Sequence, residues 1–392
     1  MQLPLFDKTF LTGLLNWRIS LPALFCIYSS YYWMYTVHRP KLICGQGKLR
    51  RFIEKRLKTD YYYPTCWAPG GHLQTILRAV FQILPPIHYT REILPTPDGG
   101  EIALDWIDDD RDTYRGLVVI LPGLTGGSQS SYSQYLGYQA KLFGCRAVIY
   151  NNRGCGNSLL KTPKFACAAH TDDLHIVLQF MKKKYPDLPF IVAGVSLGGI
   201  ILSNYLANED IKEKYVDIGF AASIAWDFHK SQASLETPFN RITYNRYLGK
   251  NLVKLAENNY EMFHKNRDQL PFNLDDVPNC TTIAEFDACV TVPLFGYKHI
   301  SDYYSDASFA FKTHRVKTPI VFINAPNDPF SPENAIPVDD IAKNSNLALI
   351  LTKTGGHIGF MEGLFPVGST YMDRLFGQFL EAYLDHSSDL KD

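Results

Sequence analysis

Among all features of the sequence, Ser196, a serine flanked by glycines, most limits the folds that this chain can adopt. It lies in the run Gly-Val-Ser-Leu-Gly-Gly, directly after the apolar residues 190–193 and directly before another apolar run. Small residues two positions before and after a serine let the backbone turn sharply from a strand into a helix, and Gly194 and Gly198 occupy these positions. The run predicts a nucleophile elbow, with the Leu197 amide aimed at a developing oxyanion. A plain strand-to-helix turn is the alternative for the motif taken alone.

Two residues further along the chain, an aspartate and a histidine, could activate Ser196. A nucleophilic serine needs a histidine to take its proton and an acid to orient that histidine, here in the chain order serine, acid, histidine. The strand-like run 318–325 leads into a Pro-Asn-Asp-Pro turn containing Asp328, and His357 lies in a glycine-flanked loop after the apolar run 347–351. We expect Asp328 to be the acid and His357 the base, although Asp328 could instead cap a helix near Ser331.

The loop that follows the strand-like run 116–121 is expected to supply a second oxyanion donor. It reads Pro-Gly-Leu-Thr-Gly-Gly-Ser over residues 122–128, and glycine-rich loops of this kind present backbone amides. We expect the Leu124 amide to act together with that of Leu197, with Thr125 as the next choice. A flexible glycine loop without this role is the alternative.

Four motifs together resemble those of one family. The chain carries Pro-Gly-Leu-Thr-Gly-Gly-Ser at 122–128, Asn-Asn-Arg-Gly-Cys at 151–155, Gly-Val-Ser-Leu-Gly-Gly at 194–199 and Gly-Gly-His-Ile-Gly-Phe at 355–360. On these residues the chain resembles the α/β-hydrolase domain-containing 1/3 group of the AB hydrolase superfamily, over roughly residues 60–385. The resemblance implies a membrane-anchored serine hydrolase of lipid esters, with Ser196 as nucleophile, Asp328 as acid and His357 as base.

More than one activity is compatible with this resemblance. Phospholipase and acyltransferase chemistry both occur among relatives, and the His-x-x-x-x-Asp string associated with acyl transfer in a neighbouring branch is replaced here by His357 and Glu362. This departure favours lipid ester hydrolysis over acyl transfer to an alcohol or lysolipid. The alternatives from another class are a catalytically silent α/β-hydrolase used for binding and a membrane scaffold. The expected mechanism needs no metal or organic cofactor.

Composition is consistent with one large enzyme core and argues against a nucleic-acid partner. The chain has 392 residues, enough for an α/β core with an insertion. Lys plus Arg and Asp plus Glu are both 39, so no net charge attracts polyanions from a distance. The eight cysteines form no CxxC pair, and we expect them to be buried or free thiols.

The N-terminal region is expected to anchor the chain in a membrane. Residues 19–37 contain no charged side chain, and at about 1.5 Å per residue they would span roughly 28 Å, close to the hydrocarbon thickness of a bilayer. Basic residues flank the stretch at Arg18 and within 38–41. We expect one transmembrane helix over about 19–37, in an endomembrane such as the endoplasmic reticulum, and leave the side of the catalytic domain open. A cleaved signal peptide is one alternative, although the stretch has no A-x-A-like cleavage site. An interfacial or buried helix is the other.

The expected architecture is an α/β-hydrolase fold, with a mostly parallel eight-stranded sheet flanked by helices. The strand-like runs are 87–94, 101–107, 116–121, 146–150, 190–193, 218–225, 318–325 and 347–351. About ninety residues separate the runs 218–225 and 318–325. An insertion of that length predicts a helical lid over the pocket. The expected segments are a membrane anchor over 1–45, a linker with the N-terminal strands over 46–115, the first part of the core over 116–225, the lid over 226–316 and the second part of the core over 317–388.

Overall fold

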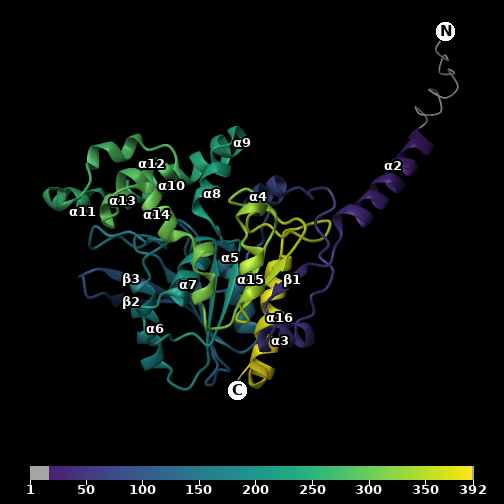
Figure 1. Ribbon diagram of the computed structural model, residues 1–392, viewed down its shortest axis with the longest axis horizontal. Coiled ribbons are helices and arrows are strands. Elements are labelled where there is room, and N and C mark those ends of the chain that lie inside the picture. The colour runs from purple at the N-terminus through teal and green to yellow at the C-terminus, as the bar shows by residue number, and fades with distance from the viewer. Residues whose placement is uncertain (1–16, 391–392) are drawn as a thin grey trace, which may run out of the picture.

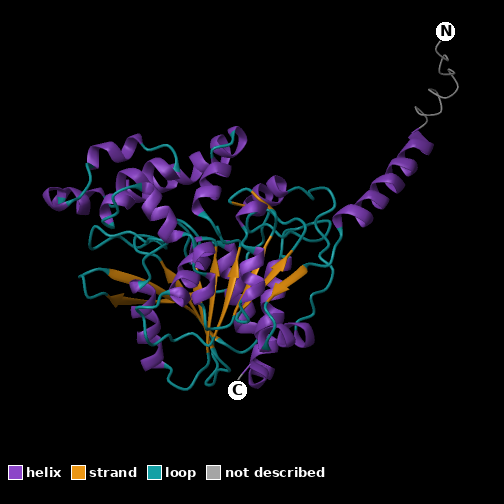
Figure 2. Cartoon of the chain, in the orientation of Figure 1, coloured by secondary structure: helices purple, strands orange, loops and turns teal. Residues whose placement is uncertain are grey.

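A nine-stranded sheet lies at the centre of the computed structural model, which describes residues 17–390. The strands are β1 (Lys41–Cys44), β2 (Tyr89–Pro95), β3 (Glu101–Ile107), β4 (Leu117–Leu121), β5 (Arg146–Asn151), β6 (Phe190–Val195), β7 (Ile218–Ala222), β8 (Ile320–Asn324) and β11 (Leu347–Leu351). Their order is β1-β11-β8-β7-β6-β4-β5-β3-β2. The sheet is drawn in orange in Figure 2. The six strands from β11 to β5 are parallel to their neighbours, whereas β1, β2 and β3 pair antiparallel at the two edges.

All eight strand-like runs form strands of this sheet, but the expected total of eight is wrong because β1 adds a ninth. It pairs with β11 from Lys41, opposite Leu351, to Cys44, opposite Ala348. Only Cys44 is buried in this four-residue edge strand, so the apolar run that reveals central strands is missing. The strand lies within the range 1–45 expected to be a membrane anchor, and the sheet therefore begins before residue 46.

Helices cover both faces of the sheet (Figure 1). They are α3 (Lys48–Arg56), α5 (Ser131–Leu142), α6 (Asp172–Lys184), α7 (Leu197–Ala207), α15 (Val338–Lys343) and α16 (Tyr371–His386). Further helices are α4 (Gly71–Val80), η8 (Glu333–Ala335) and η9 (Ser387–Leu390). Alternate residues of β4 point into two different cores: Val118 and Ile120 pack with α3, α5 and α16, whereas Leu117, Val119 and Leu121 pack with α6, α7 and α15. This period of two is what a strand buried on both faces requires.

Local chemistry sets the ends of two of these helices. At the start of α16, the Thr370 hydroxyl accepts a hydrogen bond from the Asp373 amide, and the Asp373 carboxylate accepts one from the Thr370 amide. This reciprocal capping box satisfies amides that the first turn leaves without partners. Helix α6 has Asp172 and Asp173 in its first turn and lysines in its last turn, which complements the helix dipole.

A run of helices between residues 228 and 315 connects β7 to β8. It consists of α8 (Phe228–Leu235), α9 (Pro238–Asn240), η2 (Arg241–Asn245), α10 (Arg246–Glu257), α11 (Tyr260–Lys265), η3 (Arg267–Gln269), η4 (Leu274–Asn279), α12 (Ile283–Phe286), η5 (Asp287–Thr291), α13 (Val292–Leu294), α14 (Ile300–Ala307), η6 (Phe309–Phe311) and η7 (Thr313–Arg315). Most of these helices lie beyond one end of the sheet (Figure 1). Helices α10, α11, η4, α12 and η5 share a separate apolar core, in which Phe263, Phe286 and Val290 are fully or almost fully buried.

The N-terminal helix α2 (Trp17–Tyr31) extends away from the body of the molecule (Figure 1). It continues into the π-helical turn η1 (Tyr32–Thr36), so a single α-helix over 19–37 is not what forms. Across residues 17–390, none of the helices is both long and apolar enough to cross a membrane. The predicted transmembrane helix is therefore not found in this part of the chain.

Candidate active site

Ser196 lies at a strained turn between β6 and α7. Its backbone has a φ of 52° and a ψ of −120°, a region that costs a non-glycine residue of order 1–3 kcal/mol. The Ser196 amide donates to the carbonyl of Ala222 at 2.9 Å. A Cβ on Gly194 would collide with the carbonyl of Gly198, and one on Gly198 would collide with that of Leu121. The two glycines are therefore needed because the backbones touch, as the elbow pattern predicted.

The structure brings the three predicted side chains together in one hydrogen-bonded row. His357 Nε2 lies 3.0 Å from Ser196 Oγ, and His357 Nδ1 lies 2.9 Å from Asp328 Oδ2. Asp328 is only 2% exposed, and its Oδ1 accepts a hydrogen bond of 2.7 Å from the Phe330 amide. Asp328 forms part of the two-stranded ribbon of β9 (Asn327–Asp328) and β10 (Ser331–Pro332). With Nδ1 protonated, the imidazole presents an acceptor to the serine hydroxyl.

Side chains that the motifs did not reveal hold the histidine loop in place. The His357 amide donates to Thr75 Oγ1 at 2.8 Å, and the next amide, Ile358, donates to Ser223 Oγ at 3.0 Å. The Phe330 ring lies against the imidazole, with ring centroids 4.2 Å apart. Threonine, serine and phenylalanine are too common to signal such roles.

The predicted oxyanion donors lie in the wall of the same cavity as the serine. Leu197 is the first residue of α7, and Leu124 lies in the loop after β4. In that loop the amides of Gly123 and Ser128 donate to Tyr132 Oη and Asn151 Oδ1, respectively. Among the loop and turn hydrogen bonds of residues 17–390, none is donated by the amide of Leu124 or of Leu197. Both amides therefore remain available to a bound oxyanion.

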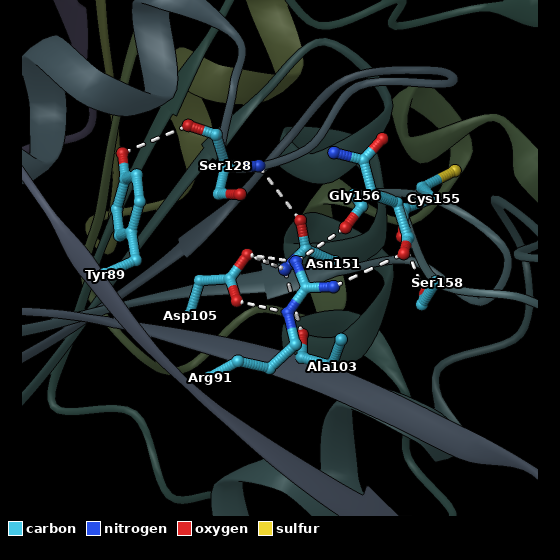
Figure 3. A network of polar contacts seen from close by, with 10 residues as sticks. Tyr89, Arg91, Ala103, Asp105, Ser128, Asn151, Cys155, Gly156 and Ser158 are labelled. Atoms are coloured by element: carbon cyan, nitrogen blue, oxygen red, sulfur yellow. Dashed lines mark hydrogen bonds and ion pairs between the residues drawn. The ribbon is translucent and has the colours of Figure 1, made fainter.

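A partly buried polar network holds the far end of the loop 122–128 (Figure 3). Asn151 Oδ1 accepts from the Ser128 amide at 2.9 Å, and Asn151 Nδ2 donates to Asp105 Oδ2, also at 2.9 Å. Arg91 forms two hydrogen bonds of 2.7 Å with Asp105 and a third with the carbonyl of Gly156. Burial by itself raises the pKa of Asp105, but the hydrogen bonds from Arg91, Ser128 and Asn151 outweigh it and lower the pKa. The carboxylate stays charged and ties the loop to the neighbouring turn.

The turn after β5 has a structural role, as its sequence suggested. Arg153 is almost fully buried and pairs with Asp98 at 2.7 Å and with Asp173 at 2.6 Å. Both carboxylates come from other elements, one from the β2–β3 turn and one from α6. Arg153 thus joins the turn after β5 to the β2–β3 turn and to α6, at the wall of the cavity.

A cavity of about 130 Å³ opens at the serine and continues beneath the insertion. Ser196, His357, Leu124 and Leu197 form part of its wall. The rest is largely apolar and comes mainly from the insertion, including Phe228, Leu235, Leu248, Leu252, Phe286, Tyr303 and Tyr304. Such a wall accepts a hydrocarbon chain better than a polar ligand. Across residues 17–390, no group of three or more His, Cys, Asp or Glu side chains could hold a metal ion.

The sharp turn at Ser196, followed along the chain by Asp328 and then His357, is the arrangement of the α/β-hydrolase class. The fold and the site therefore define a serine ester hydrolase of that class.

Comparison with known proteins gives the family. The family described as alpha/beta hydrolase fold matches residues 116–364. Human phospholipase ABHD3 is 39% identical over 371 residues, which cover 93% of this chain and 89% of the relative. A monoacylglycerol lipase of Saccharomyces cerevisiae is 28% identical, with 75% of this chain and 74% of the relative covered. An esterase from Pyrococcus furiosus, among solved structures, has 17% identity, covers 77% of this chain with 95% of its own, and gives a TM-score of 0.49. The chain belongs to the α/β hydrolase family and, within it, to the ABHD3 group.

Proposed function

We propose that this protein cleaves carboxylic esters of lipids, of the phospholipid or acylglycerol type. The observation that carries the proposal is the row from Ser196 through His357 to buried Asp328 at the wall of an apolar cavity. The names of two relatives, a phospholipase and a monoacylglycerol lipase, support a lipid substrate. Both the family and the cavity therefore favour an ester with a long apolar group.

The proposed chemistry has two steps. His357 takes the proton of Ser196 as its oxygen attacks the ester carbonyl, and then gives that proton to the leaving alcohol, which departs and leaves an acyl-enzyme. A water molecule, deprotonated by His357, then attacks the acyl-enzyme. The bond between the acyl group and Ser196 Oγ breaks, His357 returns the proton to Oγ, and the fatty acid is released. Asp328 holds the imidazole in the tautomer required and stabilises its charged form. The amides of Leu124 and Leu197 would stabilise the oxyanion in both steps.

The insertion and the N-terminal region have places in the same proposal. We propose that helices α8 to α14 act as a lid, because they provide most of the apolar cavity wall. Association with a lipid surface is proposed for α2, whose described side chains Leu24, Phe25 and Ile27 are exposed although apolar. A helix with an apolar surface of this kind can lie in a membrane interface without crossing the bilayer.

Two other functions use the same residues and make different predictions. If an alcohol or lysolipid replaces water as acceptor, the acyl-enzyme transfers its acyl group instead of releasing a fatty acid. If the protein only binds lipid, it forms no acyl-enzyme. Release of fatty acid from phospholipid or acylglycerol, compared with transfer from acyl-CoA to an alcohol, separates the two catalytic activities.

The test of the proposal is hydrolysis of such esters by variants of the three residues. Ser196→Ala and His357→Gln should lower kcat by about 10⁴-fold or more, and Asp328→Asn by about 10³–10⁴-fold, as in serine proteases that use the same arrangement. Ser301→Ala and His264→Gln change exposed residues of the same types in the insertion and should keep wild-type rates. Folded wild-type protein that releases no fatty acid from any ester would refute the proposal.

A further inference from the structure

Helix α4 has one buried polar face and one exposed apolar face. Gln74 and Arg78 are buried against the catalytic domain. Leu73, Ile76 and Val80, spaced three and four residues apart, lie on one side of the helix and are 46%, 38% and 67% exposed. This is the reverse of an ordinary surface helix, which turns its apolar side inward and its polar side to water.

Neighbouring segments extend this apolar surface. Trp67 donates from its indole nitrogen to the carbonyl of Leu364 at 2.7 Å and lies edge-on to Phe81, with ring centroids 6.4 Å apart. Phe365, the next residue in that loop, is 82% exposed. We call the set the α4 face; it comprises Trp67, Leu73, Ile76, Val80, Phe81 and Phe365. Contiguous apolar surface drawn from three chain segments is uncommon on a soluble monomer and marks an interaction site.

The α4 face adjoins the C-terminal end of the projecting helix α2, where the turn η1 follows it. The Tyr32 hydroxyl donates to the carbonyl of Pro64 at 2.7 Å, and the rings of Trp33 and Tyr63 meet edge-on at 5.9 Å. These contacts join the root of α2 to the loop that contains Trp67. Figure 1 shows α4 and the root of α2 along the same edge of the molecule. A surface that meets one of them can therefore meet the other.

The chemistry of this edge points to a lipid surface as the occupant. Exposed tyrosine and tryptophan rings, which combine an apolar body with a polar atom, favour the headgroup level of a bilayer. The Arg39 guanidinium lies over the Tyr61 ring at 5.2 Å, and Lys41 and Lys353 are exposed nearby, with Lys353 contacting His38 at 3.2 Å. These cations complement anionic headgroups.

We propose that the α4 face is a docking surface for a lipid bilayer, distinct from the N-terminal helix. It deepens the proposed function, on which it rests, because α4 also carries Thr75, whose hydroxyl accepts a hydrogen bond from the His357 amide. One side of a single helix thus faces the lipid while its other side holds the catalytic loop. A helix is about 10 Å across, so docking brings Ser196 and its partners close to the membrane surface, and an ester can enter the cavity without crossing bulk water.

Hydrogen exchange of the full chain tests the docking directly. The Ser196→Ala chain is exchanged with and without vesicles of phosphatidylcholine and phosphatidylserine, so that no lipid is consumed. Slower exchange of amides in 71–84 and 364–367 on vesicles is the expected result. Protection of α2 alone would overturn the proposal, as would equal protection of these segments without vesicles at high protein concentration, which would identify a second copy as the occupant.

A matched pair of variants measures the contribution of the face to activity. The face variant is Leu73→Gln, Ile76→Gln and Val80→Gln, and the control is Ile93→Gln, Leu142→Gln and Val338→Gln, which also changes exposed apolar residues, on other elements. Against an ester in vesicles the face variant should lose at least about tenfold activity because its apolar contacts with lipid are gone. Against a water-soluble short-chain ester both variants should keep wild-type rates.

Two outcomes keep this inference separate from the proposed function. Equal losses on vesicle-borne and soluble ester, or none on either, would overturn the docking surface. A chain that cleaves no ester while its α4 face is protected on vesicles would refute the proposed hydrolase activity and leave the docking surface standing.

Discussion

Thr75 is the side chain through which α4 holds the catalytic histidine loop. Its hydroxyl oxygen accepts from the His357 amide at 2.8 Å and its proton goes to the carbonyl of Gly71, also at 2.8 Å. Thr75→Val keeps the shape but removes the acceptor, and an orphaned buried amide costs about 1–3 kcal/mol. We expect kcat on a soluble ester to fall about tenfold, with little change in KM. Steady-state kinetics measures this.

Thr75→Ser is the control, because it restores the hydroxyl without the methyl group. It should recover most of the wild-type kcat. A folded Thr75→Ser protein as slow as Thr75→Val would show that the methyl packing matters and that the hydrogen bond does not.

The sequence predicted the three side chains of the site, but not the residues that hold the loop of His357 in place. Ser196, Asp328 and His357 were predicted from residue type, glycine spacing and order along the chain, and the structure places them within hydrogen-bonding distance. Thr75 and Ser223 were not predicted, because they lie far along the chain from the residues that they contact. Thr75 is 282 residues from His357, and Ser223 is 135 residues from Ile358. Local patterns contain no information on such encounters.

Among the elements, the π-helical turn η5 places a buried carboxyl in the cavity wall. Asp287 accepts hydrogen bonds from Thr291 at 2.7 Å and from Tyr304 at 3.4 Å. Burial raises the pKa of Asp287 to about 7, against a smaller lowering by these two hydrogen bonds. An unfolded aspartate titrates near 4, so between about pH 4 and about pH 7 the folded state holds a proton that the unfolded state releases. Stability should therefore fall as pH rises through that window.

Asp287→Asn should remove this dependence. At pH 8 the variant should be more stable than wild type, by on the order of a few kcal/mol, because no ionised group has to be kept in an apolar wall. At pH 4 the two proteins should be about equally stable. Urea unfolding at both pH values measures the difference. Asp110→Asn, which changes an exposed carboxylate, should leave the slope unchanged, and a slope that also survives in Asp287→Asn would contradict the assignment.

Predictability differed between central and peripheral elements. Strands such as β4, buried on both faces, are continuous apolar runs that need no partner to be recognised. Strand β1 pairs with β11 at the edge of the sheet, and its own sequence contains no continuous apolar run that would predict it. The uncharged stretch 19–37 suggested a membrane-spanning helix. In the structure the α-helix contains Pro22, ends at Tyr31 and is followed by the π-helical turn η1. The length and hydropathy of the stretch did not predict this change of helix type.

In the whole molecule, the catalytic row lies between three structural parts. The parallel sheet presents Ser196 at the end of β6, the insertion roofs the apolar cavity, and α4 lies beside the histidine loop with its apolar side outward. These three parts meet at Ser196, which we propose attacks an ester drawn from a lipid surface. This attack depends on activation of Ser196 by His357, whose Nε2 lies 3.0 Å from the serine hydroxyl.

Covalent labelling with a fluorophosphonate tests this claim most directly. Mass spectrometry of the folded full chain should show a single adduct, mapped to the peptide that contains Ser196, because the phosphonyl group mimics the tetrahedral intermediate. His357→Gln should label at least about 10³-fold more slowly, whereas the exposed control His264→Gln should label at the wild-type rate. Folded wild-type protein that takes up no label at Ser196, or labels equally fast without His357, would contradict the account.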